Sequence, residues 1–203
     1  MPAPNQSTKI PRKKVRIHSE QYLIRSLETD DASDRWANWM SDPEATFMLN
    51  LASRSWTKAD IIEYIKTFDQ RSRLLLGIFD KQSGTHIGIF TVSINHLVGH
   101  FYVNLLIGEP AYRNKHVTTS IAESFREYFF ETLGMNAAIA SVLAHNAPII
   151  HYLLKNGWKL DQTLKQNVTS HADGAMLDVC LFSLSREAWR EWRKKIRAQK
   201  TTD

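Results

Sequence analysis

The sequence predicts a mixed α/β or α+β domain in which helices cover one sheet. Three observations indicate this class. Short apolar runs bounded by turn residues predict several strands in the first half of the chain. A strand–helix–strand–helix–strand succession follows between residues 100 and 164, and one more strand precedes a C-terminal helix. The 203 residues are enough for one domain with a sizeable core, and neither a linker nor an internal repeat divides them.

The first half is expected to begin with a strand over residues 22–27 and a helix over 30–39, whose acidic first turn suits the helix dipole. Asp42-Pro43 ends this helix, because a residue before proline avoids the helical conformation. Thr57 and Asp60 resemble a capping box that opens a second helix. An antiparallel meander should follow, with strands over 74–79, 86–95 and 100–108.

The second half begins with a long amphipathic helix. Val117, Ile121, Phe125 and Phe129 recur every four positions, and Gly134 ends the helix. A strand over 137–143 and a short helix over 148–156, with a proline in its first turn, come next. The remaining predicted elements are strands over 158–164 and 176–184 and a basic helix over 186–199.

Positive charge is concentrated at the two ends of the chain. Residues 1–17 carry five basic residues and no acidic one, and residues 186–203 carry a net +4, which leaves −4 for residues 18–185 of a chain whose total is +5. A nucleic-acid-binding domain is expected to place positive charge on the folded face that meets the phosphates, so nucleic acid is not an expected partner. We interpret residues 1–19 as a disordered basic tail, 20–185 as the domain and 186–203 as a basic C-terminal helix and tail.

Cysteine and apolar content indicate the compartment. Cys180 is the only cysteine, which excludes an internal disulfide and predicts a reducing, cytoplasmic location. The polar first twenty residues do not form a secretory signal, and no apolar run reaches the ~18 residues that span a bilayer, so no membrane is expected. His and Cys spacing matches no metal site, and no metal is expected.

Residues 107–159 place three signals in a fixed order. A strand ends at Gly108-Glu109-Pro110, a basic turn over 112–118 opens the long helix, and Asn146 follows the next strand eleven positions before Gly157-Trp158. This order resembles the acyl-CoA site of the GCN5-related N-acetyltransferase (GNAT) family, in particular its RimJ/RimL-like branch, over residues 20–190. The resemblance implies a mixed, mostly antiparallel seven-stranded sheet with a splayed strand pair, flanked by helices.

The basic turn is the candidate site for the pyrophosphate of acetyl-CoA, because free N–H groups at a helix N-terminus bind anions. In the family this turn reads Arg/Gln-x-x-Gly-x-Gly/Ala; here Arg113 is kept, while His116 and Thr118 occupy the two glycine positions. Asn114 tolerates a left-handed backbone. The resemblance implies that these residues bind the cofactor: Leu106, Ile107, Gly108, Arg113, Asn114, Lys115, His116, Val117, Thr118, Thr119 and Asn146. Asn146 is also placed to cap the next helix.

Catalysis requires a deprotonated amine, a stabilised oxyanion and a proton for the departing thiolate. The candidate groups are Tyr102, Asn104, Glu109 and His145. The position of the family's tyrosine acid is held by Leu153; Tyr152 is one step early, ~100° around the helix, so we expect it to pack in the core. The alternative is that no side chain is essential, a backbone N–H near Leu106 or Ile107 polarising the thioester.

The resemblance therefore implies an N-acetyltransferase that transfers the acetyl group of acetyl-CoA directly to a primary amine in a ternary complex. The amine acceptor stays open, as does a homodimer. The main alternative is a non-catalytic acyl-CoA-binding or sensor protein, favoured by the atypical turn and the missing carboxylate. An RNA- or ribosome-associated protein that uses the basic ends is a third, weaker alternative.

Overall fold

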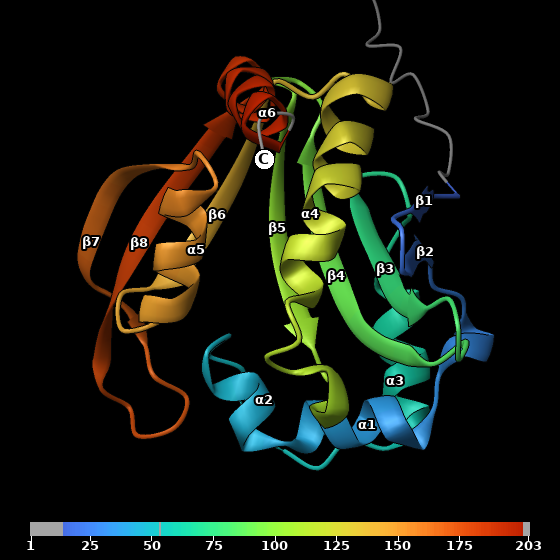
Figure 1. Ribbon diagram of the computed structural model, residues 1–203. Helices are drawn as coiled ribbons and strands as arrows, with labels where there is room; N and C mark the ends of the chain where they lie inside the picture. The colour runs from blue at the N-terminus through green and yellow to red at the C-terminus, as the bar shows by residue number, and fades with distance from the viewer. Residues whose placement is uncertain (1–13, 53, 201–203) are drawn as a thin grey trace, which may run out of the picture.

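The computed structural model describes residues 14–52 and 54–200. Within them, one eight-stranded sheet has the order β1-β2-β3-β4-β5-β6-β8-β7 (Figure 1). Its strands are β1 Arg16–His18, β2 Tyr22–Ser26, β3 Arg73–Asp80, β4 His86–Asn95, β5 His100–Ile107, β6 Ala137–Leu143, β7 Lys159–Thr169 and β8 Met176–Ser185. Neighbouring strands are antiparallel except β5 and β6, which are parallel. The expected mixed, mostly antiparallel sheet is confirmed, with one strand more than the seven expected.

The additional strand is β1, which lies in the segment expected to be a disordered tail. It pairs with β2 from Arg16↔Arg25 to His18↔Leu23, and Val15 and Ile17 are buried in the core. The boundary expected at residue 20 is therefore wrong for residues 14–19. Val15 and Ile17 are two positions apart, so both point to the same face of an extended chain, and their burial adds an edge strand to the sheet. Residues 1–13 of the expected tail lie outside the described residues.

Helices cover both faces of the sheet (Figure 1). The helices of one face are α1 Asp34–Ser41, α2 Pro43–Phe47 and α3 Lys58–Lys66, and those of the other are α4 Val117–Glu127, α5 Ala147–Lys155 and the first turns of α6 Arg186–Lys200. Trp36 of α1 is fully buried against the first face. On the second face, Phe125 of α4 stacks on Phe90 of β4 with ring centroids 4.3 Å apart. The central strands β5 and β6 thus lie between the two layers of helices.

Two expected helices differ in detail. The helix expected over 30–39 is divided into η1 Thr29–Asp31 and α1, because Ser33 accepts a hydrogen bond from the Trp36 N–H and so caps a new helix. Asp31 instead binds Arg25 at 2.8 Å. The long helix before Gly134 changes from α4 to a π-helical turn, η3 Tyr128–Thr132.

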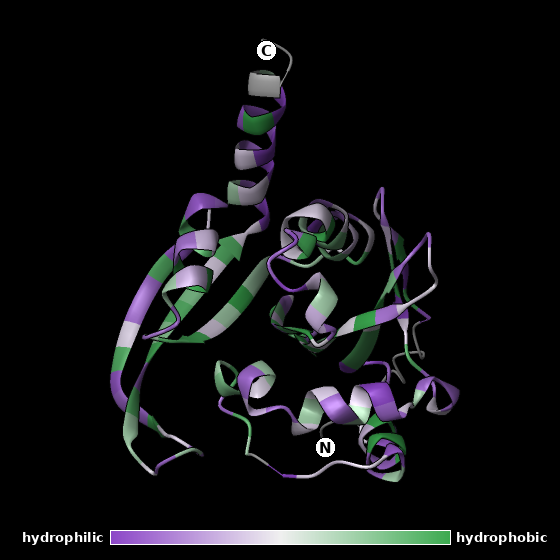
Figure 2. Ribbon diagram, turned by 60° about the horizontal axis from the view of Figure 1, so that its bottom comes forward, coloured by the Kyte–Doolittle hydropathy of each residue, from purple (hydrophilic) through white to green (hydrophobic). Residues whose placement is uncertain are grey.

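The basic helix α6 projects from the sheet and is mostly hydrophilic (Figure 2). Its Trp189 is fully buried, and Arg193 binds both Glu123 and Glu127 of α4 at 2.9 and 2.8 Å. Exposed ion pairs of this kind contribute only about 0–1 kcal/mol each, so burial of the indole is the stronger contribution to docking. The pairing also means that part of the C-terminal positive charge faces α4.

Candidate functional site

The two parallel strands separate after three residue pairs. β5 and β6 are neighbours at His100↔Ala137, Phe101↔Ala138 and Tyr102↔Ile139 only, although β5 continues to Ile107 and β6 to Leu143. β5 stays paired with β4 up to Gly88↔Ile107. Among the described residues, its other edge from Val103 onward therefore has no strand partner, and Figure 1 shows the strands diverging toward α2. This is the expected splayed pair. Its open main-chain groups suit an extended ligand that carries amides.

The N-terminus of α4 lacks a side-chain cap. In five of the six α-helices in the described part of the chain, a side-chain oxygen at the start of the helix accepts a hydrogen bond from a main-chain N–H. These oxygens belong to Ser33, Asp42, Thr57, Asn146 and Ser185. At α4 the capping position is His116, whose side chain makes no capping hydrogen bond, and the first turn contains no acidic residue. Its first N–H groups and the positive end of its dipole are thus left for an external anion.

The turn that precedes α4 has left-handed backbone angles that usually require glycine, although it contains no glycine. Asn114 and His116 have φ of 61° and 55°, in the left-handed region that a residue with a Cβ enters at a cost of about 1–2 kcal/mol. His116 is the first of the two positions where the family has glycine. Asn114, His116 and Lys115 are all exposed, so the turn is solvent-accessible. The left-handed tolerance predicted for Asn114 is used here, and His116 adopts the backbone that the glycine would adopt.

The Arg113 side chain is bound by other groups of the same chain. Its Nη2 donates to Asp42 Oδ2 and to the carbonyl of Gly108, each at 2.8 Å, and its Nη1 lies 3.8 Å from Glu44 Oε2. The hydrogen bond from Arg113 is the main reason that the pKa of Asp42 is lowered. Asp42 also caps α2. This ion pair joins the corner between α1 and α2 to the turn before α4, and sequence reasoning missed it because Asp42-Pro43 was interpreted only as the end of a helix.

The end of β5 lies between the two helix layers. The Leu106 side chain packs with α1 and α3, while Ile107 packs with the core on the α4 side. Gly108 lies against the indole of Trp39, and a Cβ built there would come within 2.2 Å of that ring. Any other residue at this position would push α1 away from the strand. The three positions predicted to contact the cofactor thus form a closely packed end of the unpaired edge.

α5 begins with Asn146, whose Oδ1 accepts the N–H of Ile149 at 3.4 Å, so the predicted cap is confirmed. Leu153 is buried in the core. The hydroxyl of Tyr152 accepts a hydrogen bond from Nη2 of Arg126 at 3.3 Å, and Arg126 is only 4% exposed. Burial raises the pKa of Tyr152, and Arg126 opposes that change. The hydroxyl is therefore engaged between α4 and α5, as its position along the helix predicted.

A cavity of about 130 Å³ lies on the opposite face of β5, beside the helices α1 and α3. Its apolar lining includes Met40, Leu49, Leu51, Ile89 and Leu106. Three further lining residues carry polar groups: Thr91 of β4 and Asn104 of β5, which face each other across the strands, and Tyr64 of α3. Of these, sequence reasoning selected Leu106 for the cofactor and Asn104 for catalysis. It missed the others, because only tertiary packing brings α1, the segment after α2 and the strands together.

The remaining catalytic candidates do not gather around this cavity. Tyr102 is 46% exposed on β5, two residues from Asn104 and so on the same face. Glu109 lies beyond the strand and pairs with Arg35 of α1 at 3.4 Å. His145 lies at the end of β6 with its ring 5.5 Å from that of Phe47, measured between centroids. The structure thus brings Asn104 alone of the four candidates into the lining of the cavity.

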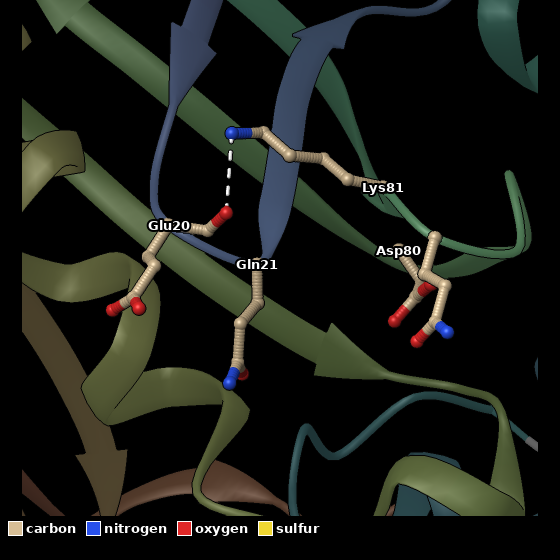
Figure 3. A pocket seen from close by; sticks show the side chains of 5 residues that line it. Glu20, Gln21, Asp80 and Lys81 are labelled. Carbon is tan, nitrogen blue, oxygen red and sulfur yellow. Dashed lines mark hydrogen bonds between the residues drawn. The ribbon is translucent and has the colours of Figure 1, made fainter.

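A second depression, of about 480 Å³, lies at the turns between β1 and β2 and between β3 and β4. Its lining is Glu20, Gln21, Asp80, Lys81 and Gln82 (Figure 3). Nζ of Lys81 donates to the carbonyls of Ser19 and Glu20. The sheet order places this depression away from the separated edges of β5 and β6.

No helix among the described residues is both long and apolar enough to cross a membrane. No three of their His, Cys, Asp and Glu side chains cluster in a way that could bind a metal ion.

Comparisons with known proteins agree with this architecture. The profile of the acetyltransferase (GNAT) domain matches residues 21–159. A GCN5-related N-acetyltransferase from Brucella melitensis superposes with a TM-score of 0.77 at 16% identity, over 93% of this chain and 86% of that one. A spermidine N-acetyltransferase from Vibrio cholerae, in complex with CoA and spermine, gives 0.73 at 17% identity over 83% and 98%.

A ribosomal-protein-S5-alanine acetyltransferase from Vibrio fischeri gives a TM-score of 0.72 at 17% identity over 86% of this chain and 98% of that one. No curated protein sequence matches the chain. At these identities the structures support the fold alone, whereas the domain profile covers more than half of the chain. The protein therefore belongs to the GNAT acetyltransferase family.

Proposed function

We propose that the protein transfers the acetyl group of acetyl-CoA directly to a primary amine, in a complex that holds both substrates at once. The observation that carries this proposal is the combination of an uncapped α4 N-terminus with a cavity on the opposite face of β5. An anionic donor bound at the helix and an amine bound in the cavity would approach from the two faces of the sheet. They would meet at the unpaired edge of β5, and holding them together supplies much of the rate.

In this proposal the pyrophosphate of acetyl-CoA accepts hydrogen bonds from the N–H groups of Val117, Thr118 and Thr119. Lys115 and the His116 imidazole lie in the same exposed turn, where they would add positive charge and a further donor. Arg113 would hold the turn through Asp42 or, after exchanging that partner, bind a phosphate oxygen. The pantetheine arm would lie along β5 from Val103 to Ile107, where main-chain groups have no strand partner among the described residues.

The chemistry follows from that arrangement. The amine nitrogen attacks the thioester carbonyl, a C–N bond forms, the C–S bond breaks, and the proton lost by nitrogen reaches the thiolate through water. A main-chain N–H near Leu106 or Ile107 would stabilise the oxyanion. A covalent acetyl-cysteine is disfavoured, because Cys180 is 6% exposed within the core and its Sγ lies 3.7 Å from Thr163 Oγ1.

Several finer assignments belong to the same proposal. We place the protein in the RimJ/RimL-like branch and in the cytoplasm, on the order of motifs in the sequence and the lone Cys180. The division into a domain and two basic ends stays a prediction, with residues 14–19 now counted in the domain, as does a homodimer. The following test distinguishes this function from that of an acyl-CoA-binding protein without catalysis.

Binding and turnover can be separated by one charged variant. Thr119 is exposed in the first turn of α4, so Thr119→Asp should stabilise the free helix through its dipole yet repel phosphate. We expect an unchanged or higher melting temperature without ligand and at least a tenfold weaker affinity for acetyl-CoA. Thr132→Asp, at the far end of the same helical segment, should leave affinity unchanged.

Thiol release from acetyl-CoA is then measured with a panel of primary amines. Release that depends on an amine supports transfer. Acetyl-CoA binding that Thr119→Asp abolishes, with no release for any amine, would favour a binding protein instead. Equal affinity for acetyl-CoA in Thr119→Asp and the wild type would show that acetyl-CoA does not bind at the α4 N-terminus.

A further inference from the structure

We infer that the acceptor of this transferase is a primary amine carried on a short, uncharged aliphatic group, and that the cavity beside β4 and β5 binds that group. The inference deepens the proposed function and rests on it. Its basis is the lining of the cavity, which is mostly apolar and contains a few uncharged polar groups.

The apolar part of the lining is largely buried. Met40, Ile89 and Leu106 are only 5%, 4% and 6% exposed. Apolar cavities of roughly 150 Å³ take up benzene, so the volume of about 130 Å³ suits a group of up to about six carbon atoms. Burying such a group in an apolar site is favourable, whereas burying an ammonium group there is strongly unfavourable.

Among the polar residues of the lining, Tyr64 of α3 adds a hydroxyl, and Thr91 and Asn104 are paired across β4 and β5. Neither side chain hydrogen-bonds to another side chain or main-chain group within the described residues, so both are open to a ligand. The amide oxygen of Asn104 can accept an amine N–H, and the Thr91 hydroxyl can donate or accept. An acyl chain offers nothing to these two groups, whereas an amine does. The cavity therefore fits the acceptor better than a longer acyl chain of the donor.

Charge argues against a polycationic acceptor. Several ammonium groups need carboxylates close by, and no charged residue lines the cavity. Two acids of the surrounding helices are already engaged. Asp42 binds Arg113 at 2.8 Å, and Asp60 accepts hydrogen bonds from the Thr57 main chain and hydroxyl.

The outer wall of the cavity is the segment after α2. Asn50 fastens it to the turn between β7 and β8: its Nδ2 donates to the carbonyl of Thr169 at 2.8 Å, and its Oδ1 accepts the N–H of His171 at 3.0 Å. Next to it, Leu51 lines the cavity and is 41% exposed. Leu51 is thus the lining residue at which a charge can be introduced with least damage to the core.

The experiment compares L-leucinamide with spermidine as acceptors, by thiol release from acetyl-CoA. For the wild type we expect kcat/KM for L-leucinamide to exceed that for spermidine at least tenfold. Leu51→Asp should shift this ratio toward spermidine by about fivefold or more, because a carboxylate then borders the cavity. Leu97→Asp is the matched control, since Leu97 is 93% exposed in the turn between β4 and β5 and should leave the ratio unchanged.

Binding is measured separately, by titrating L-leucinamide into the protein saturated with CoA. We expect saturable binding that Asn104→Ala weakens about fivefold or more. If the amine binds in this way but is not acetylated, the cavity assignment stands and the proposed transfer fails. If spermidine is acetylated as well as L-leucinamide or better, transfer stands and the cavity assignment is overturned. Absence of binding, or butyryl-CoA replacing acetyl-CoA with a higher kcat/KM, also overturns it.

Discussion

Reversing the charge of Arg113 tests the phosphate site most directly. The guanidinium makes two 2.8 Å hydrogen bonds, to Asp42 and to the Gly108 carbonyl. Shielded bonds to a charged group contribute about 1.5–3 kcal/mol each. The side chains of Arg113 and Asp42 are 23% and 32% exposed, so screening reduces the total. We expect Arg113→Glu to lower the free energy of unfolding by about 2 kcal/mol.

The same substitution should weaken CoA binding. A carboxylate about 6 Å from a phosphate, at an effective dielectric constant of about 20, is disfavoured by about 2 kcal/mol or more, which is roughly a thirtyfold rise in Kd. Isothermal titration with CoA measures this, and thermal melts report whether the fold is intact. A Kd within threefold of the wild type, with the fold intact, would refute the placement of the pyrophosphate over this turn.

Asp42→Asn separates direct binding from support of the turn. It keeps a side-chain oxygen to cap α2 but removes the charge opposite Arg113. We expect a stability loss of about 1 kcal/mol and an equal or lower Kd for CoA, because the guanidinium is freed toward the phosphates. If Asp42→Asn weakens binding as much as Arg113→Glu, Arg113 acts only by holding the turn.

Four further predictions follow from single residues. His116→Gly should leave CoA affinity equal or better, because His116 has a φ of 55°; a tenfold loss, ~1.4 kcal/mol, would show that the imidazole binds the cofactor. Tyr152→Phe should change kcat less than tenfold, since its hydroxyl is bound to Arg126; a loss of ~10²-fold or more at an unchanged melting temperature would make it the general acid. Burial lowers the pKa of His86 to about 4, below its value of 6.5 in the unfolded chain. Between these two pH values the unfolded state binds one more proton than the folded state. Urea melts should therefore show the free energy of unfolding falling by about 3 kcal/mol as the pH is lowered through this window, and falling less in His86→Gln. Equal losses in the variant and the wild type would contradict the assignment. Finally, Ile17→Ala should cost about 2–4 kcal/mol in urea melts because the side chain is 5% exposed, and an unchanged midpoint would mean that β1 is not docked.

Local patterns predicted most of the fold. Turn residues and alternating or fourfold apolar spacing act over a few neighbouring positions, so the meander, the strand at Ala137–Leu143 and the helix beginning at Val117 were all predictable. The exceptions have local explanations as well. The helix expected over 30–39 is interrupted because Ser33 caps a new helix. The three-residue strand β1 was missed because one buried Ile17 between polar neighbours is too weak a pattern.

The sequence by itself determined the sheet-and-helix architecture, the basic turn before α4 and the cap at Asn146, because each depends on residues close together in the chain. Tertiary structure decided the rest of the site. Asp42 and Arg113 are 71 positions apart, and their ion pair exists only because α1 packs against the end of β5. Packing likewise pairs Glu109 with Arg35, and it places Asn104 opposite Thr91 in a cavity lined by α1, α3, the segment after α2 and two strands. A pattern along the chain records which side chains share a face, but the distance between remote groups is set by how the layers pack.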